Sequence, residues 1–251
     1  MTEERPSPPS LTIGDRLVLG PLVANVEHIL NHPRLISLRF DGDRHGIYEG
    51  LATQGRPIQY AHVPEPLALW DVWTSLAGPP VAFESPSAGF ALDWKTLTAW
   101  RQRGVKFATL TLAVGISSTG DSELDARLPL DEPYVIPDVT AHAVAHTKHR
   151  GGRVVAIGTT VVRALESAAS TSIEVKSGAG IAQKLIGPGT DLKIVDVVLT
   201  GMHEPGESHF ELLRAFADGS LLERVHAAAV AGGYRSHEFG DSLIIGRRAA
   251  A

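Results

Sequence analysis

Residues 153–169 read Arg153-Val-Val-Ala-Ile-Gly-Thr-Thr-Val-Val-Arg-Ala-Leu-Glu-Ser-Ala-Ala169. The apolar run before Gly158 is typical of a buried strand, and the run that follows Thr159 is typical of a helix. A helix that starts directly after a strand points its unpaired N–H groups, and the positive end of its dipole, beyond the strand's carboxyl end. Open α/β sheets bind ligands at that edge. We therefore expect a binding site around this turn.

Strand-like and helix-like patterns alternate through most of the chain after residue 100. Strands are expected at residues 105–114, 153–157, 184–186, 194–199 and 242–245, and helices at residues 139–149, 160–169, 208–217 and 220–231. This alternation predicts an α/β fold with a mostly parallel, barrel-like sheet and flanking helices. The last two helices open with Ser-x-x-Glu, at Ser208/Glu211 and Ser220/Glu223, and each pair predicts a capping box.

The N-terminal part has a different pattern. Residues 1–10 are acidic and rich in proline and serine, and we expect a disordered leader there. Short apolar runs at residues 16–19, 22–26 and 35–40 are separated by turn residues, which predicts a small antiparallel, β-barrel-like subdomain over residues 11–60. A proline-rich passage follows, and we expect the α/β domain to occupy residues 61–251.

Composition excludes several classes of site. The chain has 251 residues and no cysteine, so disulfides, thiolate nucleophiles and zinc–thiolate centres are excluded and a cytoplasmic location is expected. No run has the order of a secretion signal or the length of a membrane span. The net charge of -5 argues mildly against tight nucleic-acid binding, although a local basic patch is compatible with it.

Three polar residues of the predicted helix at 160–169 recur at intervals of three: Thr160, Arg163 and Glu166. This spacing places them along one side of a helix. Arg163 could hold a ligand carboxylate there, and Glu166 a ribose hydroxyl. The alternative is a capping threonine followed by an ordinary surface ion pair.

Other polar and aromatic residues have simpler interpretations. His142, His146 and His149 share a helix face, but the spacing lacks the glutamate of a metalloprotease motif, and solvated histidines are expected rather than a metal site. Ser87 lacks the glycines of a nucleophile elbow and is interpreted as a turn or ligand-contacting hydroxyl. The four tryptophans are expected to pack in the core or against helices, with base stacking as the alternative. They are Trp70, Trp73, Trp94 and Trp100.

Several further motifs stand in order along the chain. They are Gly14-Asp15-Arg16-Leu17, Pro86-Ser87-Ala88-Gly89, Gly187-Pro188-Gly189, Val195-Asp196, Thr200-Gly201-Met202-His203-Glu204-Pro205, Ala215-Phe216-Ala217, Tyr234-Arg235 and Phe239-Gly240-Asp241. With the run from Gly158 to Ala169, this order resembles the S-adenosylmethionine:tRNA ribosyltransferase-isomerase family of queuosine biosynthesis. The resemblance covers residues 14–245 and is strongest after residue 153.

The resemblance implies a function and its residues. Enzymes of this family use S-adenosylmethionine as a ribosyl donor, with no metal and no separate cofactor. The ribosyl group is isomerised and transferred to 7-aminomethyl-7-deazaguanine in tRNA, while adenine and methionine leave. His203 and Glu132 resemble the family's residues for proton transfer, and Asp241 could orient a base. The expected substrate-binding residues are Thr159, Thr160, Arg163, Glu166, Ser87, Ala88, Gly89 and Gly240.

The chain also differs from the family pattern. The family carries histidines where this chain has Gly89-Phe90-Ala91-Leu92, Ala113 and the segment 127–130. The family's N-terminal segment is expected to be missing, because the chain starts within the β-barrel part. Two alternatives therefore stay open beside transfer to tRNA. One is a relative that binds or cleaves S-adenosylmethionine with a small acceptor or none, and the other is a non-catalytic binding subunit. The oligomeric state is not predicted.

Overall fold

The structure is a computed structural model that describes residues 9–60, 62–78, 84–113, 116, 119, 121–236 and 239–247. These residues divide into two compact units. The first unit comprises the described residues up to Gln59 together with Glu65–Leu69, and the second comprises Tyr60–Pro64 and the described residues from Trp70 onward. Residues 1–8 of the expected leader lie outside the described part of the chain.

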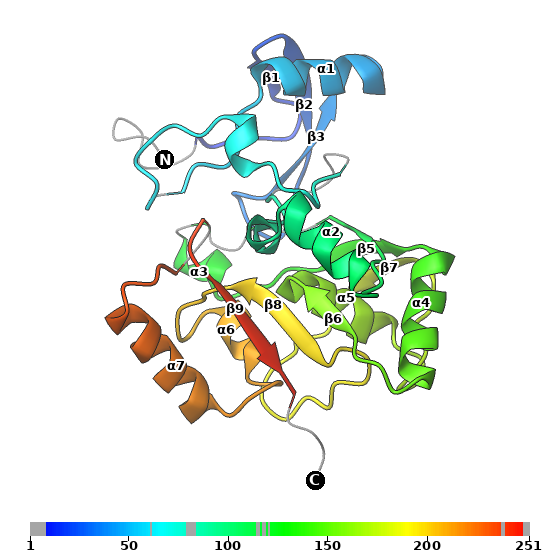
Figure 1. The fold of residues 1–251 in the computed structure, drawn as a ribbon. Helices are drawn as coiled ribbons and strands as arrows, with labels where there is room; N and C mark the ends of the chain where they lie inside the picture. The colour runs from blue at the N-terminus through cyan, green and yellow to red at the C-terminus, as the bar shows by residue number, and fades with distance from the viewer. Residues whose placement is uncertain are drawn as a thin grey trace. The chain divides into compact units, whose positions relative to one another are not determined.

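The first unit is a small antiparallel sheet with one helix. Strands β1 (Arg16–Leu19), β2 (Leu22–Ile29) and β3 (Ile36–Phe40) pair in the order β1-β2-β3, as Figure 1 shows. The alternate residues Leu22, Ala24 and Val26 are buried, which confirms the strands predicted here. Helix α1 (Arg44–Gln54) was not predicted, and Asp43 caps its start by accepting the N–H of Gly46. The three strands form an open sheet and not a barrel.

The second unit contains two three-stranded sheets. Strands β6 (Val155–Ile157), β8 (Val197–Gly201) and β9 (Ser242–Gly246) form one sheet, with β8 in the centre. Strands β4 (Thr111–Leu112), β5 (Glu132–Ile136) and β7 (Gly178–Ala182) form the other. The predicted α/β class is confirmed, since helices and strands are mixed throughout the unit.

The prediction of a mostly parallel sheet is wrong. Among the described strands β6 and β8 are parallel, whereas β8–β9, β4–β5 and β5–β7 are antiparallel. Alternation of strands and helices does not reveal the direction in which a strand returns, and β9 returns antiparallel after a helix. The strand expected at residues 184–186 is also absent, and the glycine-rich β7 forms instead.

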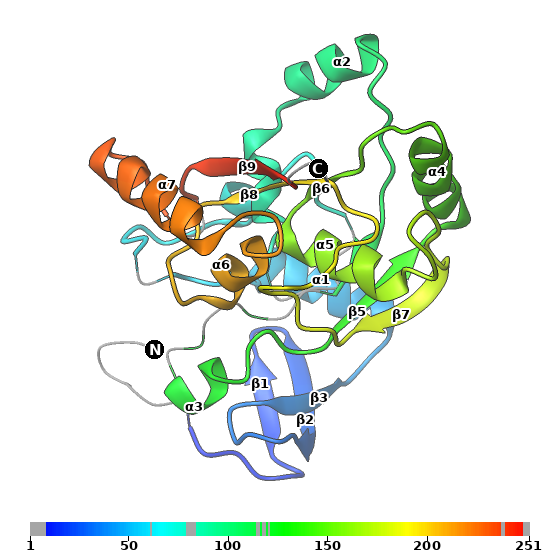
Figure 2. The same ribbon diagram turned by 90° about the horizontal axis from the view of Figure 1, so that it is seen from below.

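Helix α5 (Thr159–Ala168) lies between the two sheets of this unit, as Figure 2 shows. It contacts β6 and β8 on one side and β4, β5 and β7 on the other. Burial on both sides explains why seven of its ten residues are buried, including the charged residues Arg163 and Glu166. The core around it includes Ile136, Val162, Ile194 and Val198, each essentially inaccessible to solvent.

The structure describes further helices along the chain from residue 69. They are η1 (Leu69–Val72), η2 (Ser87–Ala91), α2 (Trp94–Gln102), α3 (Ser122–Asp125), α4 (Asp138–His149), α6 (Ser208–Leu213) and α7 (Gly219–Ala231). The predicted capping boxes do not form. The N-cap residues are Glu207 for α6 and Asp218 for α7, and neither side chain caps its helix. Within the described residues, no helix has the length and apolar character needed to cross a membrane.

The tryptophans are less buried than predicted. Trp70, Trp73 and Trp94 are between 66% and 80% exposed. Trp100 is half-buried and stacks on Phe107, with 6.3 Å between the ring centroids. The strand predicted at residues 105–114 is reduced to β4, and residue 114 lies outside the described residues.

Candidate functional site

The predicted turn from strand to helix forms at the carboxyl end of β6. Gly158 extends the pairing of β6 with β8, since its N–H donates to the carbonyl of Leu199 at 2.8 Å. Its φ of 99° lies in the region that favours glycine. Helix α5 starts at the next residue, Thr159, and no side chain caps its first N–H groups. The first turn of α5 is therefore arranged to accept an anionic group from outside the helix.

Helix η2 brings a second predicted segment to this turn. A Cβ built on Gly158 would lie 3.8 Å from Cβ of Ala88, and η2 packs against β8. Gly89 is buried against Thr74, where an added Cβ would come within 2.9 Å of Oγ1. The structure thus brings residues 87–89 and 158–160 together, as expected if both contribute to one site.

His203 lies just beyond the carboxyl end of β8. Its Nε2 is 2.9 Å from Oγ1 of the buried Thr200, the last residue but one of that strand. The ring of His209, on α6, lies 4.7 Å from the ring of His203 between centroids. Thr200 and His209 thus hold the imidazole at the same edge of the sheet as the start of α5. Neither of these two contacts was predicted from the sequence.

Gly240 and Asp241 form a turn beside His203. The carboxylate of Asp241 accepts the N–H of Arg235 at 2.8 Å, and its carbonyl accepts the N–H of Met202 at 2.9 Å. A Cβ on Gly240 would clash with two backbone carbonyls, so only glycine fits this turn. The bonds of Asp241 that the structure shows are to backbone groups.

Aromatic rings lie next to these segments. The rings of Phe90, on η2, and Phe239 are 5.2 Å apart between centroids. Tyr60 packs edge-on against Phe239 at 5.8 Å and lies 5.6 Å from His62. Phe90 remains 38% exposed, so it presents an accessible flat surface. These rings were missed by the sequence analysis, although Phe90 directly follows the Ser87–Gly89 motif.

Arg163 is not at this site surface. Its side chain is 3% exposed and forms an ion pair with Glu132, on β5, whose side chain is 5% exposed. Its terminal nitrogens also donate to the carbonyls of Leu130, at 3.2 Å, and Ala182, at 3.0 Å. The predicted ligand-carboxylate clamp and the alternative of a surface ion pair both disagree with this geometry. Glu132, predicted to move protons, serves here as the buried counter-charge.

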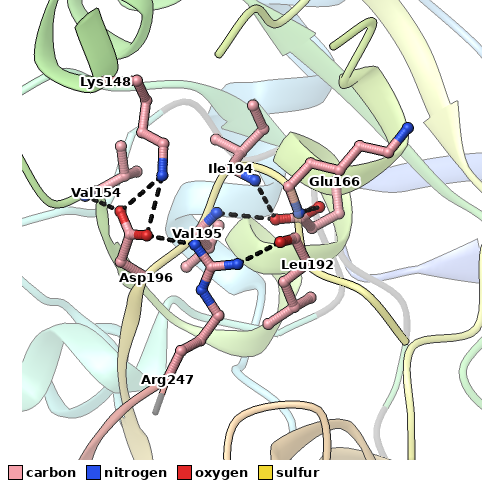
Figure 3. A network of polar contacts seen from close by, with 9 residues as sticks. Lys148, Val154, Glu166, Leu192, Ile194, Val195, Asp196 and Arg247 are labelled. Carbon is pink, nitrogen blue, oxygen red and sulfur yellow. Dashed lines mark hydrogen bonds and ion pairs between the residues drawn. The ribbon is translucent and has the colours of Figure 1, made fainter. Parts of the chain in front are cut away.

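Glu166 is also occupied by the protein itself. Its carboxylate accepts the backbone N–H groups of three consecutive residues, at 2.8, 2.9 and 2.8 Å, as Figure 3 shows. These are residues 193–195. The geometry does not support the predicted bond to a ribose hydroxyl, because both carboxylate oxygens are used to hold the segment that leads into β8. Spacing along the helix could not reveal this partner, which lies far along the sequence.

Asp196, in the Val195-Asp196 motif, has a related structural role. It contacts Lys148 at 2.9 Å, the N–H of Val154 at 2.8 Å, and the guanidinium of Arg247 (Figure 3). Burial alone would raise the pKa of Asp196, but the Val154 N–H, Arg247 and Lys148 together lower it below the ordinary 3.8. The carboxylate therefore stays ionised and ties α4, β6 and β9 together at the end of the sheet opposite the candidate site.

The predicted histidine group on α4 is solvent-exposed. His142, His146 and His149 are exposed, and Nδ1 of His149 lies 2.8 Å from the carbonyl of Ala145. Across the described ranges, no three histidine, aspartate or glutamate side chains are grouped so as to hold a metal ion.

Comparison with known proteins identifies the family. A family model described as "Queuosine biosynthesis protein" matches residues 5–245. The chain belongs to the queuosine biosynthesis protein family. Its relatives include the S-adenosylmethionine:tRNA ribosyltransferase-isomerase of Chlorobium phaeobacteroides, which is 31% identical over 94% of this chain and 71% of the relative. The corresponding enzyme of Sorangium cellulosum is 37% identical over 78% of this chain and 56% of that protein.

A solved structure shows the same fold. The crystal structure of an S-adenosylmethionine tRNA ribosyltransferase from Thermotoga maritima matches with a TM-score of 0.54 and 26% identity, over 93% of this chain and 66% of that chain. The chain spans about half the length of several curated family members that it matches, 56% and 51% for two of them. The resemblance expected from the ordered motifs is therefore confirmed.

Proposed function

We propose that the second unit is the catalytic domain and binds S-adenosylmethionine at the carboxyl ends of β6 and β8. The protein then transfers and isomerises the ribosyl group onto 7-aminomethyl-7-deazaguanine in tRNA. One observation carries the proposal: four separate segments meet at this edge. They are the Gly158–Thr160 turn, helix η2, residues 200–203 and the turn at residues 239–241. The names of the relatives support the same chemistry.

The donor's methionine part fits the start of α5. A carboxylate there would accept N–H groups of Thr159 and Thr160 that no side chain caps, and the helix dipole would favour its negative charge. Gly158 lets the ligand approach the backbone, because it has no side chain. Arg163 supports this arrangement from inside by fixing α5 to β5 through Glu132, without touching the ligand.

The adenosine part fits beside η2. Ala88 and Gly89 offer a small, closely packed surface, and the accessible ring of Phe90 offers a flat face for a purine. Ser87 can contribute its hydroxyl, because it is half-buried at the start of η2. Gly240 and Asp241 shape the opposite wall by holding Phe239 and the backbone at Met202.

His203 is the proposed base. The sulfonium of the donor acidifies the adjacent 5′ carbon, and in this proposal His203 accepts the proton released there. Thr200 and His209 orient the imidazole. Glu132 is assigned a supporting role through Arg163, since its carboxylate is buried in the α5–β5 contact.

A second function is favoured by particular residues. By the resemblance, the segment Gly89-Phe90-Ala91-Leu92 and Ala113 stand where the family carries histidines, and the chain's net charge is -5. A protein with the same donor site but without those histidines could cleave S-adenosylmethionine, or use a small acceptor, instead of modifying tRNA.

Donor binding and turnover test the proposal separately. Calorimetry with S-adenosylmethionine should show one site, and chromatography should detect adenine when tRNA containing 7-aminomethyl-7-deazaguanine is added. His203→Gln should lower adenine release by at least about 100-fold, the smaller end of a general base's contribution. His146→Gln, an exposed histidine on α4, is the matched control and should leave the rate unchanged.

The outcomes distinguish the two functions. Adenine release that needs the modified tRNA supports transfer to RNA, whereas release without any RNA supports the second function. Binding of S-adenosylmethionine with no adenine under either condition would remove both catalytic functions and leave a binding protein.

A further inference from the structure

Helix α2 packs directly on the strand ends that form the candidate site. Its buried Leu97 forms one apolar cluster with Leu92 and Leu199, and the half-buried Ile157 packs against that cluster. Leu199 belongs to β8, and Ile157 is the last residue of β6. Figure 2 shows α2 projecting beyond the β6–β8–β9 sheet. The helix is therefore fixed beside the site while its other side faces solvent.

The solvent side of α2 and the turn after it carry a concentrated positive charge. Between residues 94 and 120 the sequence contains four basic residues and no aspartate or glutamate, although the whole chain has a net charge of -5. All four basic side chains are exposed. We call them, together with Trp94, the α2 basic surface: Trp94, Lys95, Arg101, Arg103 and Lys106.

Stability of the helix does not account for these charges. Cations stabilise the last turn of a helix, which suits Arg101, but a cation in the first turn is unfavourable, and Lys95 stands there. Lys106 lies beyond the helix end. Within the described part of the chain, the ion pairs involve none of these four residues. The carboxylate of Asp93 is used to cap α2 through the N–H of Thr96 at 2.6 Å.

The surface also carries an accessible aromatic ring. Trp94 is 68% exposed at the start of α2. Indole rings that are exposed among cations are suited to stack on unpaired bases, while the cations contact the adjacent phosphates. The guanidinium of Arg101 lies over the ring of Phe107 at 5.4 Å, which keeps this charge beside the segment that follows α2.

We propose that the α2 basic surface binds the phosphates of the RNA acceptor next to the nucleotide that is modified. This inference rests on the proposed function, because RNA is the acceptor there. Charge complementarity and the position of α2 beside the strand ends favour RNA over any other occupant. Lys95, Arg101, Arg103 and Lys106 supply the phosphate contacts, and Trp94 stacks on a base of the loop.

A pair of neutralising variants tests the surface. Lys95→Gln/Arg101→Gln/Arg103→Gln/Lys106→Gln removes the four charges of the α2 basic surface. Arg150→Gln/Arg153→Gln/Lys176→Gln/Lys184→Gln removes four exposed charges elsewhere. Both change the net charge from -5 to -9, because four positive charges are lost in each. Binding of a tRNA transcript is measured by fluorescence anisotropy between about 50 and 200 mM salt, the range over which phosphate contacts change affinity most visibly.

The α2 variant should bind at least about 10-fold more weakly, and its slope of log Kd against log salt should fall by about 2–3, or about 0.7 for each lost contact with single-stranded RNA. The control should stay within about twofold of the unmodified chain. Trp94→Ala should weaken binding about 5- to 100-fold, the range for loss of one stacked base. It also decides the question if the fourfold variant fails to fold.

Equal affinity and equal salt slope for the α2 variant and the control would overturn the inference, as would a chain that binds no tRNA. S-adenosylmethionine affinity, measured on the same samples, should be the same for all variants. If the unmodified chain does not bind S-adenosylmethionine, the proposed function is refuted. The comparison of RNA affinities between the α2 variant and the control would still test whether the α2 basic surface binds RNA.

Discussion

Replacing Arg163 by methionine should strongly lower the free energy of unfolding of the second unit. The substitution keeps most of the side-chain volume but leaves Glu132 as a buried carboxylate without its cation. Breaking a buried pair in this way costs about 3–5 kcal/mol, because the remaining charge loses its compensation. The carbonyls of Leu130 and Ala182 also lose the guanidinium N–H donors, whose nitrogens lie 3.2 and 3.0 Å from the two carbonyl oxygens in the intact protein. We expect the free energy of unfolding to fall by this amount.

Urea unfolding followed by fluorescence measures the effect. Arg153→Met is the matched control, since Arg153 is exposed ten residues earlier, and it should change stability by less than about 0.5 kcal/mol. The double variant Arg163→Met/Glu132→Leu removes both charges and should be more stable than the sum of the single changes predicts, by about 1–3 kcal/mol.

A ligand role for Arg163 gives the opposite pattern. An Arg163→Met variant with the urea midpoint of the unmodified chain, but with weakened binding of S-adenosylmethionine, would refute the structural role and restore the predicted clamp. In the folded Arg163→Met protein we expect the donor affinity to stay within about twofold, because the guanidinium does not reach the strand-end surface in the structure.

Three further predictions follow from particular contacts. Asp196→Asn should lower the free energy of unfolding at neutral pH by about 1–3 kcal/mol, the value of hydrogen bonds to a charged group. The pKa of Asp196 is depressed below the ordinary 3.8, so the stabilisation by its carboxylate is present above pH 3.8 and is lost as the pH falls below it. The urea midpoints of the two proteins should therefore converge only as the pH falls below about 4. Gly240→Ala should cost about 1–3 kcal/mol, because its Cβ meets the carbonyls of residues 235 and 236, whereas Gly201→Ala, with open space around its Cβ, should cost less than Gly240→Ala in the same thermal scan. Thr200→Val should slow adenine release about 3- to 10-fold by removing the contact with His203, and an unchanged rate would show that Thr200 does not position the imidazole.

The sequence predicted the local elements that carry strong patterns. The strands of the first unit, helix α4 and the strand–glycine–helix sequence at residues 155–168 all form close to their expected bounds. The glycine turn and the Ser87–Gly89 segment also meet, as a shared site requires. These features depend on residues close in sequence, or on motifs that occur together in the family.

What was missed depends on contacts between distant residues. The helical spacing of Thr160, Arg163 and Glu166 indicates either a ligand-binding side of the helix or a surface ion pair, but a second sheet covers α5 and buries Arg163 and Glu166. Strand β5 supplies Glu132 to Arg163, and residues 193–195 supply their N–H groups to Glu166. No local sequence pattern predicts that Arg163 contacts Glu132 or that Glu166 contacts residues 193–195. The same limitation applies to sheet direction, which follows from how β9 returns to β8.

The charged residues of α5 also show how polar residues of a motif can have a structural role without touching a ligand. Two buried charges and their partners specify one rotation of the helix about its axis, because any other rotation would leave an ion or three N–H groups unsatisfied. An apolar helix between two sheets would lack that restriction.

Because α5 is held between two sheets, one wall of the candidate site cannot adjust. Any rocking or sliding of the helix would open gaps in both layers at once, so the amides at its start behave as a fixed reference point. Adaptation to the incoming molecule is then left to η2 and to the turn at residues 239–241. Substitutions in those two segments can change what the protein accepts, while the start of α5 stays as it is.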